Sequence, residues 1–260
     1  MFDAWRRPDD KMPRKKGGVT AIAFDSLVDI LSKEMYSVLG VAVFGEPRFN
    51  HLLMGLQLAR ELALSRSEIG YAGYQPVVLT VLFFKTLNDL LSASLSIRAG
   101  YALQAYPCLR AALETSELME HLKDHPENVE HYVRGAEDFA RDTSWIRKEL
   151  PDSKTRIKVY DFLNYQTHAN FKGLNIYTTY DVDGSTTAAE VGPTPLRSPA
   201  MTAPYLFLVI IAAYAIRTMW RLDESAVSKS WLERFQAFDQ SAEHFLAEVP
   251  PPPGSRTAED

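Results

Sequence analysis

An uninterrupted apolar stretch runs from Ala203 to Ile216, where Arg217 closes it. Apolar runs of this length are shorter than a bilayer requires and are more often the buried core helices of a folded domain. Extending the window back to residue 198 lengthens the uncharged stretch, but it adds serine, proline and threonine. The stretch therefore predicts a core helix, and a transmembrane span is the alternative.

A second apolar segment begins after Pro76, because proline suits the first turn of a helix. The run VVLTVLFF that follows leaves no polar face, which predicts a central helix, surrounded on all sides, that continues to about Ile97. Gly100 and Pro107 then interrupt the pattern. Because proline lacks an N–H and clashes with the carbonyl four residues before it, we expect a kink or a break at Pro107.

The remaining helices follow from apolar residues repeated at i, i+3, i+4 and i+7. These patterns predict helices near residues 19–39, 49–63, 108–123, 126–139, 145–146, 153–171, 198–223 and 229–248. Over about 175–191, β-branched and aromatic residues flank Asp183-Gly184, which suits a type I′ turn, so we expect a small β-hairpin there. The predicted fold is an all-α bundle of seven to nine helices with one hairpin inserted.

The composition is that of an ordinary globular chain, since its 260 residues are 46% hydrophobic and 23% charged, with a net charge of −5. We expect a flexible basic tail over residues 1–18, a single helical domain over 19–249 and a proline-rich tail over 250–260. The basic N-terminal stretch does not lead into an apolar signal-peptide region. A single cysteine, Cys108, excludes an intramolecular disulfide, and both features favour a cytoplasmic protein.

The segment Tyr160–Asn170 is the richest of the chain in groups able to do chemistry. Tyr160, Asn164 and His168 recur every four residues, so on a helix they form one polar row at the edge of the buried face. Because an imidazole titrates near neutral pH, His168 is the candidate general acid or base, and a structural histidine is the alternative. Tyr160, Asn164 and Asn170 are candidate binding residues.

A second polar face is predicted on the helix that follows Pro107. It consists of residues at helical spacing, namely Arg110, Glu114, Glu117 and His121. The simpler interpretation is a solvated face with an exposed Arg–Glu pair. In the alternative, Arg110 points into a cleft and holds a phosphate or carboxylate while Glu114 orients it. Arg110 is then a second candidate catalytic residue, and Glu114 is a candidate binding residue.

The sequence favours neither a metal nor a cofactor. His121 and His125 have the spacing of a helical metal pair, but Pro126 biases His125 away from helical geometry. The motifs of nucleoside triphosphate hydrolases, dinucleotide-binding enzymes, zinc peptidases and α/β-hydrolases do not occur in the sequence. We therefore expect no metal site and no cofactor.

The motifs LRAALE, at 109–114, and YDFLNYQTHAN, at 160–170, carry a resemblance to a known family. They resemble a widespread family of bacterial all-α proteins in which an LRxxLE-like helix is followed by a YxxLSxxxH-like helix. That family is similar to the HEPN superfamily of helical domains, several of whose members are metal-independent endoribonucleases of toxin–antitoxin and antiphage systems. The resemblance covers about residues 75–215 and implies an all-α fold.

The HEPN nuclease signature places an arginine and a polar residue before a histidine. In this sequence His168 matches the histidine and Asn164 the polar residue, but Leu163 occupies the arginine position. Because leucine cannot donate to a phosphate, an endoribonuclease of this kind needs Arg110 or Arg156 to reach the same place. HEPN-like proteins without the signature bind RNA, other ligands or protein partners.

Three hypotheses for the function follow from these observations. The first is an HEPN-like module that binds RNA, a nucleotide or a protein partner, with an endoribonuclease that has a relocated arginine as its enzymatic alternative. The second is an interaction protein that forms a homodimer through apolar helices, such as the one at 203–216. The third and least favoured is a membrane-associated helical protein.

Overall fold

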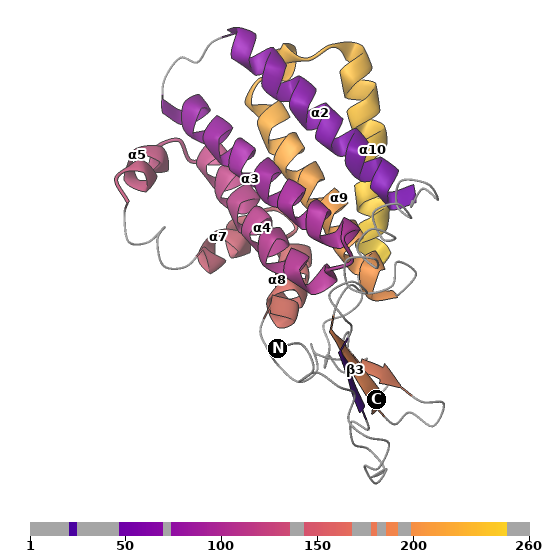
Figure 1. Ribbon diagram of the computed structural model, residues 1–260. Helices are drawn as coiled ribbons and strands as arrows, with labels where there is room; N and C mark the ends of the chain where they lie inside the picture. The colour runs from indigo at the N-terminus through magenta and orange to yellow at the C-terminus, as the bar shows by residue number, and fades with distance from the viewer. Residues whose placement is uncertain are drawn as a thin grey trace, which may run out of the picture.

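The computed structural model describes residues 21–24, 47–69, 74–135, 143–167, 178–180, 186–191 and 199–248. These residues form eight α-helices, which confirms the predicted all-α class (Figure 1). The helices are α2 (Pro47–Ile69), α3 (Tyr74–Arg98), α4 (Ala102–Asp124), α5 (Asn128–Val133), α7 (Ser144–Glu149), α8 (Ser153–Thr167), α9 (Pro199–Leu222) and α10 (Lys229–Glu248), with a short 3-10 helix, η3, at Glu224–Ala226.

Three short strands complete the described elements: β1 (Ala21–Phe24), β2 (Thr178–Tyr180) and β3 (Thr186–Val191). β3 lies in the middle, parallel to β1 and antiparallel to β2. The helix expected over 19–39 is therefore wrong at Ala21–Phe24, because a short apolar run suits a strand as well as a helix. The turn at Asp183-Gly184 lies outside the described residues, so the hairpin stays a prediction.

The apolar stretch predicted as a core helix forms the centre of the bundle. Residues 205–216 of α9 are at most 4% exposed, because α2, α3, α4 and α10 all pack against this helix. In Figure 1, α9 runs lengthwise through the bundle with these four helices around it. The apolar surface of residues 205–216 is thus already covered within one chain.

Helix α3 differs from its prediction as a fully surrounded helix. One side packs against α4 and α9, and it buries Leu79, Leu82, Phe83, Leu90, Ala93 and Ile97. The other side is exposed and also carries apolar residues. By length and composition alone, two helices in the described part of the chain are apolar enough to cross a membrane: Tyr74–Arg98 and Pro204–Leu222.

The break expected at Pro107 is absent. Helix α4 begins at Ala102 and continues through Pro107 to Asp124, and the chain turns earlier, at Gly100, whose φ is 91°. Pro107 lies in the second turn of the helix, where a proline removes a single intrahelical hydrogen bond. The packing of α4 against α3, α8 and α9 keeps the helix continuous across that position.

Helix α8 is held against α4 and α9 by three buried side chains, Val159, Phe162 and Leu163. The Phe162 ring centroid lies 6.0 Å from that of Tyr106 on α4 and 5.0 Å from that of Phe207 on α9. This apolar contact fixes the rotation of α8 about its own axis. Its polar row is thereby turned toward the polar face of α4.

Candidate functional site between α4, α7 and α8

Two helices that are distant in the sequence meet at Arg110. The Arg110 guanidinium donates from Nη1 to Asn164 Oδ1 on α8, at 2.9 Å, and from Nε to Glu114 Oε1 on its own helix, at 3.2 Å. The side chains of Arg110 and Glu114 are each 31% exposed. The guanidinium is therefore held in a fixed orientation while part of it remains in contact with solvent.

The ring of Tyr160 lies beside this pair. Its centroid is 5.7 Å from Cζ of Arg110 and 3.5 Å from Cζ of Arg147, so two guanidinium groups neighbour one aromatic ring. Burial raises the pKa of the Tyr160 phenol, and the Glu114 carboxylate raises it further. The phenol thus stays protonated at neutral pH and can act as a hydrogen-bond donor. We call Arg110, Glu114, Tyr160 and Asn164 the outer cluster.

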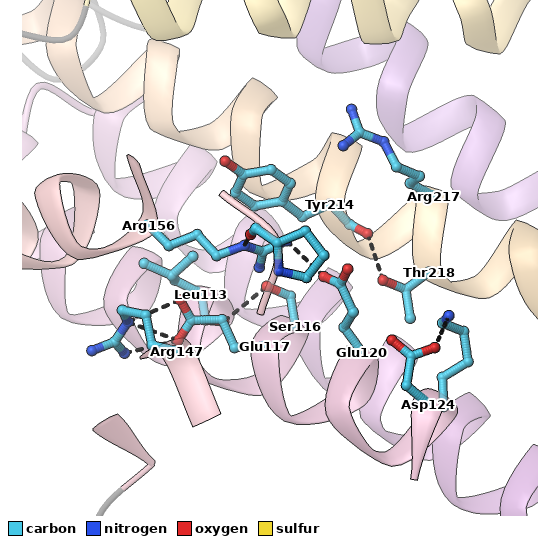
Figure 2. A network of polar contacts seen from close by, with 12 residues as sticks. Leu113, Ser116, Glu117, Glu120, Asp124, Arg147, Arg156, Tyr214, Arg217 and Thr218 are labelled. Carbon is cyan, nitrogen blue, oxygen red and sulfur yellow. Dashed lines mark hydrogen bonds and ion pairs between the residues drawn. The ribbon is translucent and has the colours of Figure 1, made fainter. Parts of the chain in front are cut away.

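Deeper along the same face of α4, Glu117 pairs with Arg147 of α7 (Figure 2). Arg147 donates from Nε to both carboxylate oxygens, at 2.9 and 3.0 Å, and its Nη2 lies 2.8 Å from Oε2. The Glu117 side chain is completely buried, and that of Arg147 is 4% exposed. Arg147 therefore lies between a carboxylate and the Tyr160 ring and is closed off from solvent.

The arrangement repeats one turn further along α4. Arg156 of α8 donates from Nη2 to Glu120 Oε2 at 2.6 Å and from Nε to the carbonyl of Pro151 at 3.1 Å. The Arg156 Cζ lies 4.2 Å from the ring centroid of Tyr214 on α9, and Figure 2 shows this ring beside the guanidinium. We call the two buried pairs, Glu117–Arg147 and Glu120–Arg156, the inner network.

The solvated face expected on α4 is wrong for its deeper residues. Glu117 and His121 are buried, and so is Glu120, which was not part of the predicted face, because α7 and α8 cover this end of α4 and supply the two arginines. Burial raises the pKa of Glu117, and its partner Arg147 opposes that shift. Only the Arg110–Glu114 end of the face is open to solvent.

The histidines at the end of α4 form an aromatic group. The His121 ring lies 4.6 Å from that of His125 and 4.9 Å from that of Trp145, measured between centroids, and Asn128 Nδ2 is 3.2 Å from His121 Nε2. Burial lowers the pKa of His121, and His125 lowers it further. Among the residues that the structure describes, no group of three or more His, Cys, Asp or Glu could hold a metal ion.

The structure brings together four of the six predicted site residues: Arg110, Glu114, Tyr160 and Asn164. The other two, His168 and Asn170, lie outside the described residues, since the description of α8 ends at Thr167. Leu163, at the arginine position of the HEPN signature, is fully buried. Of the two arginines considered as replacements, Arg156 is buried and paired with Glu120, and Arg110 bonds to Asn164.

Sequence reasoning missed the roles of Arg147 and Glu120. Arg147 belongs to the six-residue helix α7, whose apolar pattern is too short to show which side is buried. A signal was present in the spacing of Glu117 and Glu120, which are three residues apart and so share one face of α4 with buried neighbours. Two carboxylates that face a core require cationic partners.

Comparison of the chain with known protein families, with curated proteins and with solved structures finds no match. The fold and the site define a class only: an all-α bundle with a buried Glu–Arg network that leads to a half-exposed arginine cluster.

Proposed function

We propose that the outer cluster binds a phosphate of RNA or of a nucleotide, with Arg110 as the principal contact. The observation that carries the proposal is the state of the Arg110 side chain: it is held by Asn164 and Glu114, yet it is 31% exposed. Because the guanidinium is already oriented and still reaches solvent, it loses little conformational entropy when it binds an anion. A preoriented guanidinium at such a place suits a phosphate.

The hydrogen-bond capacity of Arg110 supports this proposal. A guanidinium carries five N–H donors in a planar fork. Two of these donors, on Nε and Nη1, bond to Glu114 and Asn164. The remaining donors can form the paired bonds that planar phosphate recognition uses. The protonated phenol of Tyr160 and the amide of Asn164 add polar groups at the same place.

The charges around the outer cluster are paired, so a phosphate must compete with Glu114 for Arg110. Glu117 neutralises Arg147, and Glu120 neutralises Arg156, so the inner network presents no net charge to the outer cluster. Arg110 forms an ion pair with Glu114, and both side chains are partly exposed. Because water screens such a pair, a phosphate can replace the Glu114 carboxylate as the partner of Arg110. The resemblance to HEPN-like domains, in which RNA is a common ligand, points to the same class of ligand.

The test is binding of a fluorescently labelled single-stranded RNA, measured by anisotropy at fixed salt. Arg110→Ala should weaken binding by roughly 10- to 100-fold, because hydrogen bonds to charged groups contribute about 1.5–3 kcal/mol. The matched control is Arg60→Ala, since Arg60 is an exposed arginine on α2, and α2 has no extensive contact with α8. Equal affinities of the Arg110→Ala and Arg60→Ala proteins would falsify the proposal.

The direct Arg110–Asn164 bond also favours a second candidate, a metal-independent endoribonuclease with Arg110 in place of the missing arginine. Asn164 precedes His168 by one helical turn in the sequence. In this candidate His168 takes the proton of the ribose 2′-hydroxyl, and the 2′-oxygen attacks the adjacent phosphorus. The bond from phosphorus to the 5′-oxygen breaks, the leaving oxygen takes up a proton, and Arg110 stabilises the added negative charge.

Cleavage of the labelled RNA in the presence of a metal chelator separates the two candidates. The endoribonuclease requires that His168→Ala abolish cleavage but leave RNA affinity within a few fold, whereas Arg110→Ala lowers both. If the unmodified protein binds the RNA but does not cleave it, the result favours the RNA-binding module over the endoribonuclease. In either case a role in bacterial defence or in a toxin–antitoxin pair is the setting that the resemblance implies.

A further inference from the structure

The exposed side of α3 carries a regular line of mostly apolar residues. Its members are Tyr74, Val77, Val81, Phe84, Asn88, Leu91 and Leu95, and we call them the heptad stripe. The six apolar members are between 45% and 78% exposed, and Asn88 is exposed as well. Lone exposed apolar residues are ordinary, but a continuous line of them along one helix marks a contact surface.

The spacing of the stripe is that of a coiled coil. Successive members are separated alternately by three and four residues from Tyr74 to Leu95, a length of about three heptads. In heptad terms Tyr74, Val81, Asn88 and Leu95 are the a positions, and the d positions lie between them. The opposite side of α3 is buried against α4 and α9, so the stripe points directly away from the bundle. This geometry is suited to a second helix lying alongside.

Polar groups at the middle of the stripe argue for a protein partner and against lipid. Asn88 stands within the stripe itself, and Lys85 beside it is 52% exposed and paired with Asp89 at 2.8 Å. An ammonium and an amide near the centre of a lipid-facing helix are costly. In contact with another helix the same groups can be hydrogen-bonded or can remain in water.

Asn88 also indicates what the partner is. In a parallel pair of helices each a position faces the same a position of its partner, so an a-position asparagine meets an asparagine only if the partner carries one in the same register. In an antiparallel pair an a position faces a d position, which in this stripe is always apolar. We propose that the heptad stripe is the contact surface between two copies of this chain, whose α3 helices lie parallel with Asn88 against Asn88.

This proposal stands apart from the phosphate site, because the heptad stripe and the outer cluster share no residue. It also accounts for the sequence of α3, which carries apolar residues on two opposite sides although one chain covers only one of them. The second copy supplies the missing cover. A dimer through α3 thus takes the place of the one expected through the helix at 203–216, which is buried inside each chain.

The oligomeric state of the full chain, measured by sedimentation equilibrium, is the first test. The unmodified protein should be a dimer, and Val81→Glu should weaken association by at least about tenfold, because it places two like charges across the seam. Leu53→Glu is the matched control, since Leu53 is an exposed leucine on α2 and should leave the dimer intact. Both variants should keep the circular dichroism of the unmodified protein, because the replaced side chains are largely exposed.

Cysteine cross-linking tests the parallel arrangement in a way that does not depend on a variant losing association, so a misfolded variant cannot be mistaken for a positive result. Cys108 is the single native cysteine, so a Cys108→Ser background carrying either Val81→Cys or Leu95→Cys has one thiol per chain. Because a disulfide requires Cα atoms within about 7 Å, both proteins cross-link to themselves on oxidation only if the helices are parallel and in register. An antiparallel pair lets at most one of them do so.

Replacement of the asparagine completes the test. Asn88→Val should strengthen association, because an asparagine at an a position lowers the stability of the coiled coil that it specifies. A strictly monomeric unmodified protein overturns the proposal, and so does a dimer that Val81→Glu leaves unchanged. A monomer that sediments with vesicles of phosphatidylcholine and phosphatidylglycerol overturns it in favour of a lipid surface.

Discussion

The inner network and the outer cluster are both built from Arg–Glu pairs whose glutamates follow one another every three residues along α4. They differ in their access to solvent. Arg110–Glu114 and Arg147–Glu117 are both Arg–Glu pairs beside the ring of Tyr160. The first pair is 31% exposed at both side chains, whereas the second is almost completely buried. Helices α7 and α8 cover the inner network, whereas within the described residues the Arg110–Glu114 pair is hydrogen-bonded across helices only by Asn164 of α8.

This difference determines what each pair can contribute. In a buried pair each charge depends on the other, because neither can be solvated by water, so the pair acts as a fixed part of the fold. In a half-exposed pair water can replace either partner, so the pair contributes little to stability and can exchange partners with a ligand. The comparison assigns stability to the inner network and ligand binding to the outer cluster.

The largest expected effect comes from removing the buried carboxylate. Glu117→Ala leaves the Arg147 guanidinium buried without its partner and should lower the free energy of unfolding by about 3–5 kcal/mol. Glu114→Ala, the matched change in the outer cluster, should lower it by less than about 1 kcal/mol. Urea denaturation followed by circular dichroism measures both values. Similar losses in the two variants would remove the distinction between the two regions.

The helices themselves could largely be predicted from the sequence. Apolar patterns indicated every α-helix of the described residues: a repeat of about 3.6 positions where a helix packs on one side, and unbroken apolar runs in α3 and α9. Pro107 and α3 show where such reasoning fails. At Pro107 the local sequence predicts a break, but the packing of α4 against its neighbours keeps the helix continuous. In α3 the apolar residues predict a buried surface, but the sequence does not show whether the same chain or another one buries it.

The site could be predicted only in part. The sequence selected Arg110 and Asn164 as candidate residues, but not the hydrogen bond between them, which joins positions 54 residues apart. It could not distinguish Glu114 from Glu117 either, because both lie on one face of α4 at helical spacing. Their difference arises from α7, a six-residue helix whose position depends on tertiary packing.

A middle-sized effect is expected from exchanging arginine for lysine in the two regions. Arg147→Lys keeps the charge but loses the two-pronged contact with Glu117 and the stacking on Tyr160, so it should cost about 1–3 kcal/mol of stability. Arg110→Lys should change stability by less than about 0.5 kcal/mol, because its pair is half-exposed. The same variant should still weaken RNA binding, since an ammonium lacks the planar fork.

The two lysine variants therefore separate stability from binding. Thermal denaturation and RNA anisotropy on the same preparations give both quantities. The comparison fails if Arg110→Lys destabilises the protein as much as Arg147→Lys does. It also fails if Arg147→Lys, in a protein that remains folded at the assay temperature, lowers RNA affinity more than Arg110→Lys.

The smallest effect concerns His121, at the far end of the buried face of α4. Burial and the neighbouring His125 lower the pKa of His121 below the ordinary histidine value of about 6.5. As the pH falls below that value, the unfolded chain takes up a proton on this residue before the folded protein does. Stability should therefore decrease between neutral pH and the lower pKa of the folded state.

His121→Gln should remove this part of the pH dependence, whereas His131→Gln, at an exposed histidine of α5, should leave it unchanged. The quantity to compare is the slope of the unfolding free energy against pH, because the substitution at a buried site also lowers stability by an amount that does not vary with pH. The raised pKa of Glu117 acts in the opposite direction, since the folded state then binds protons more readily than the unfolded chain. It is present in all three proteins and cancels in the comparison.

An unchanged slope in His121→Gln would mean that the end of α4 is open to water. The burial that separates the inner network from the outer cluster would then stop at Glu120.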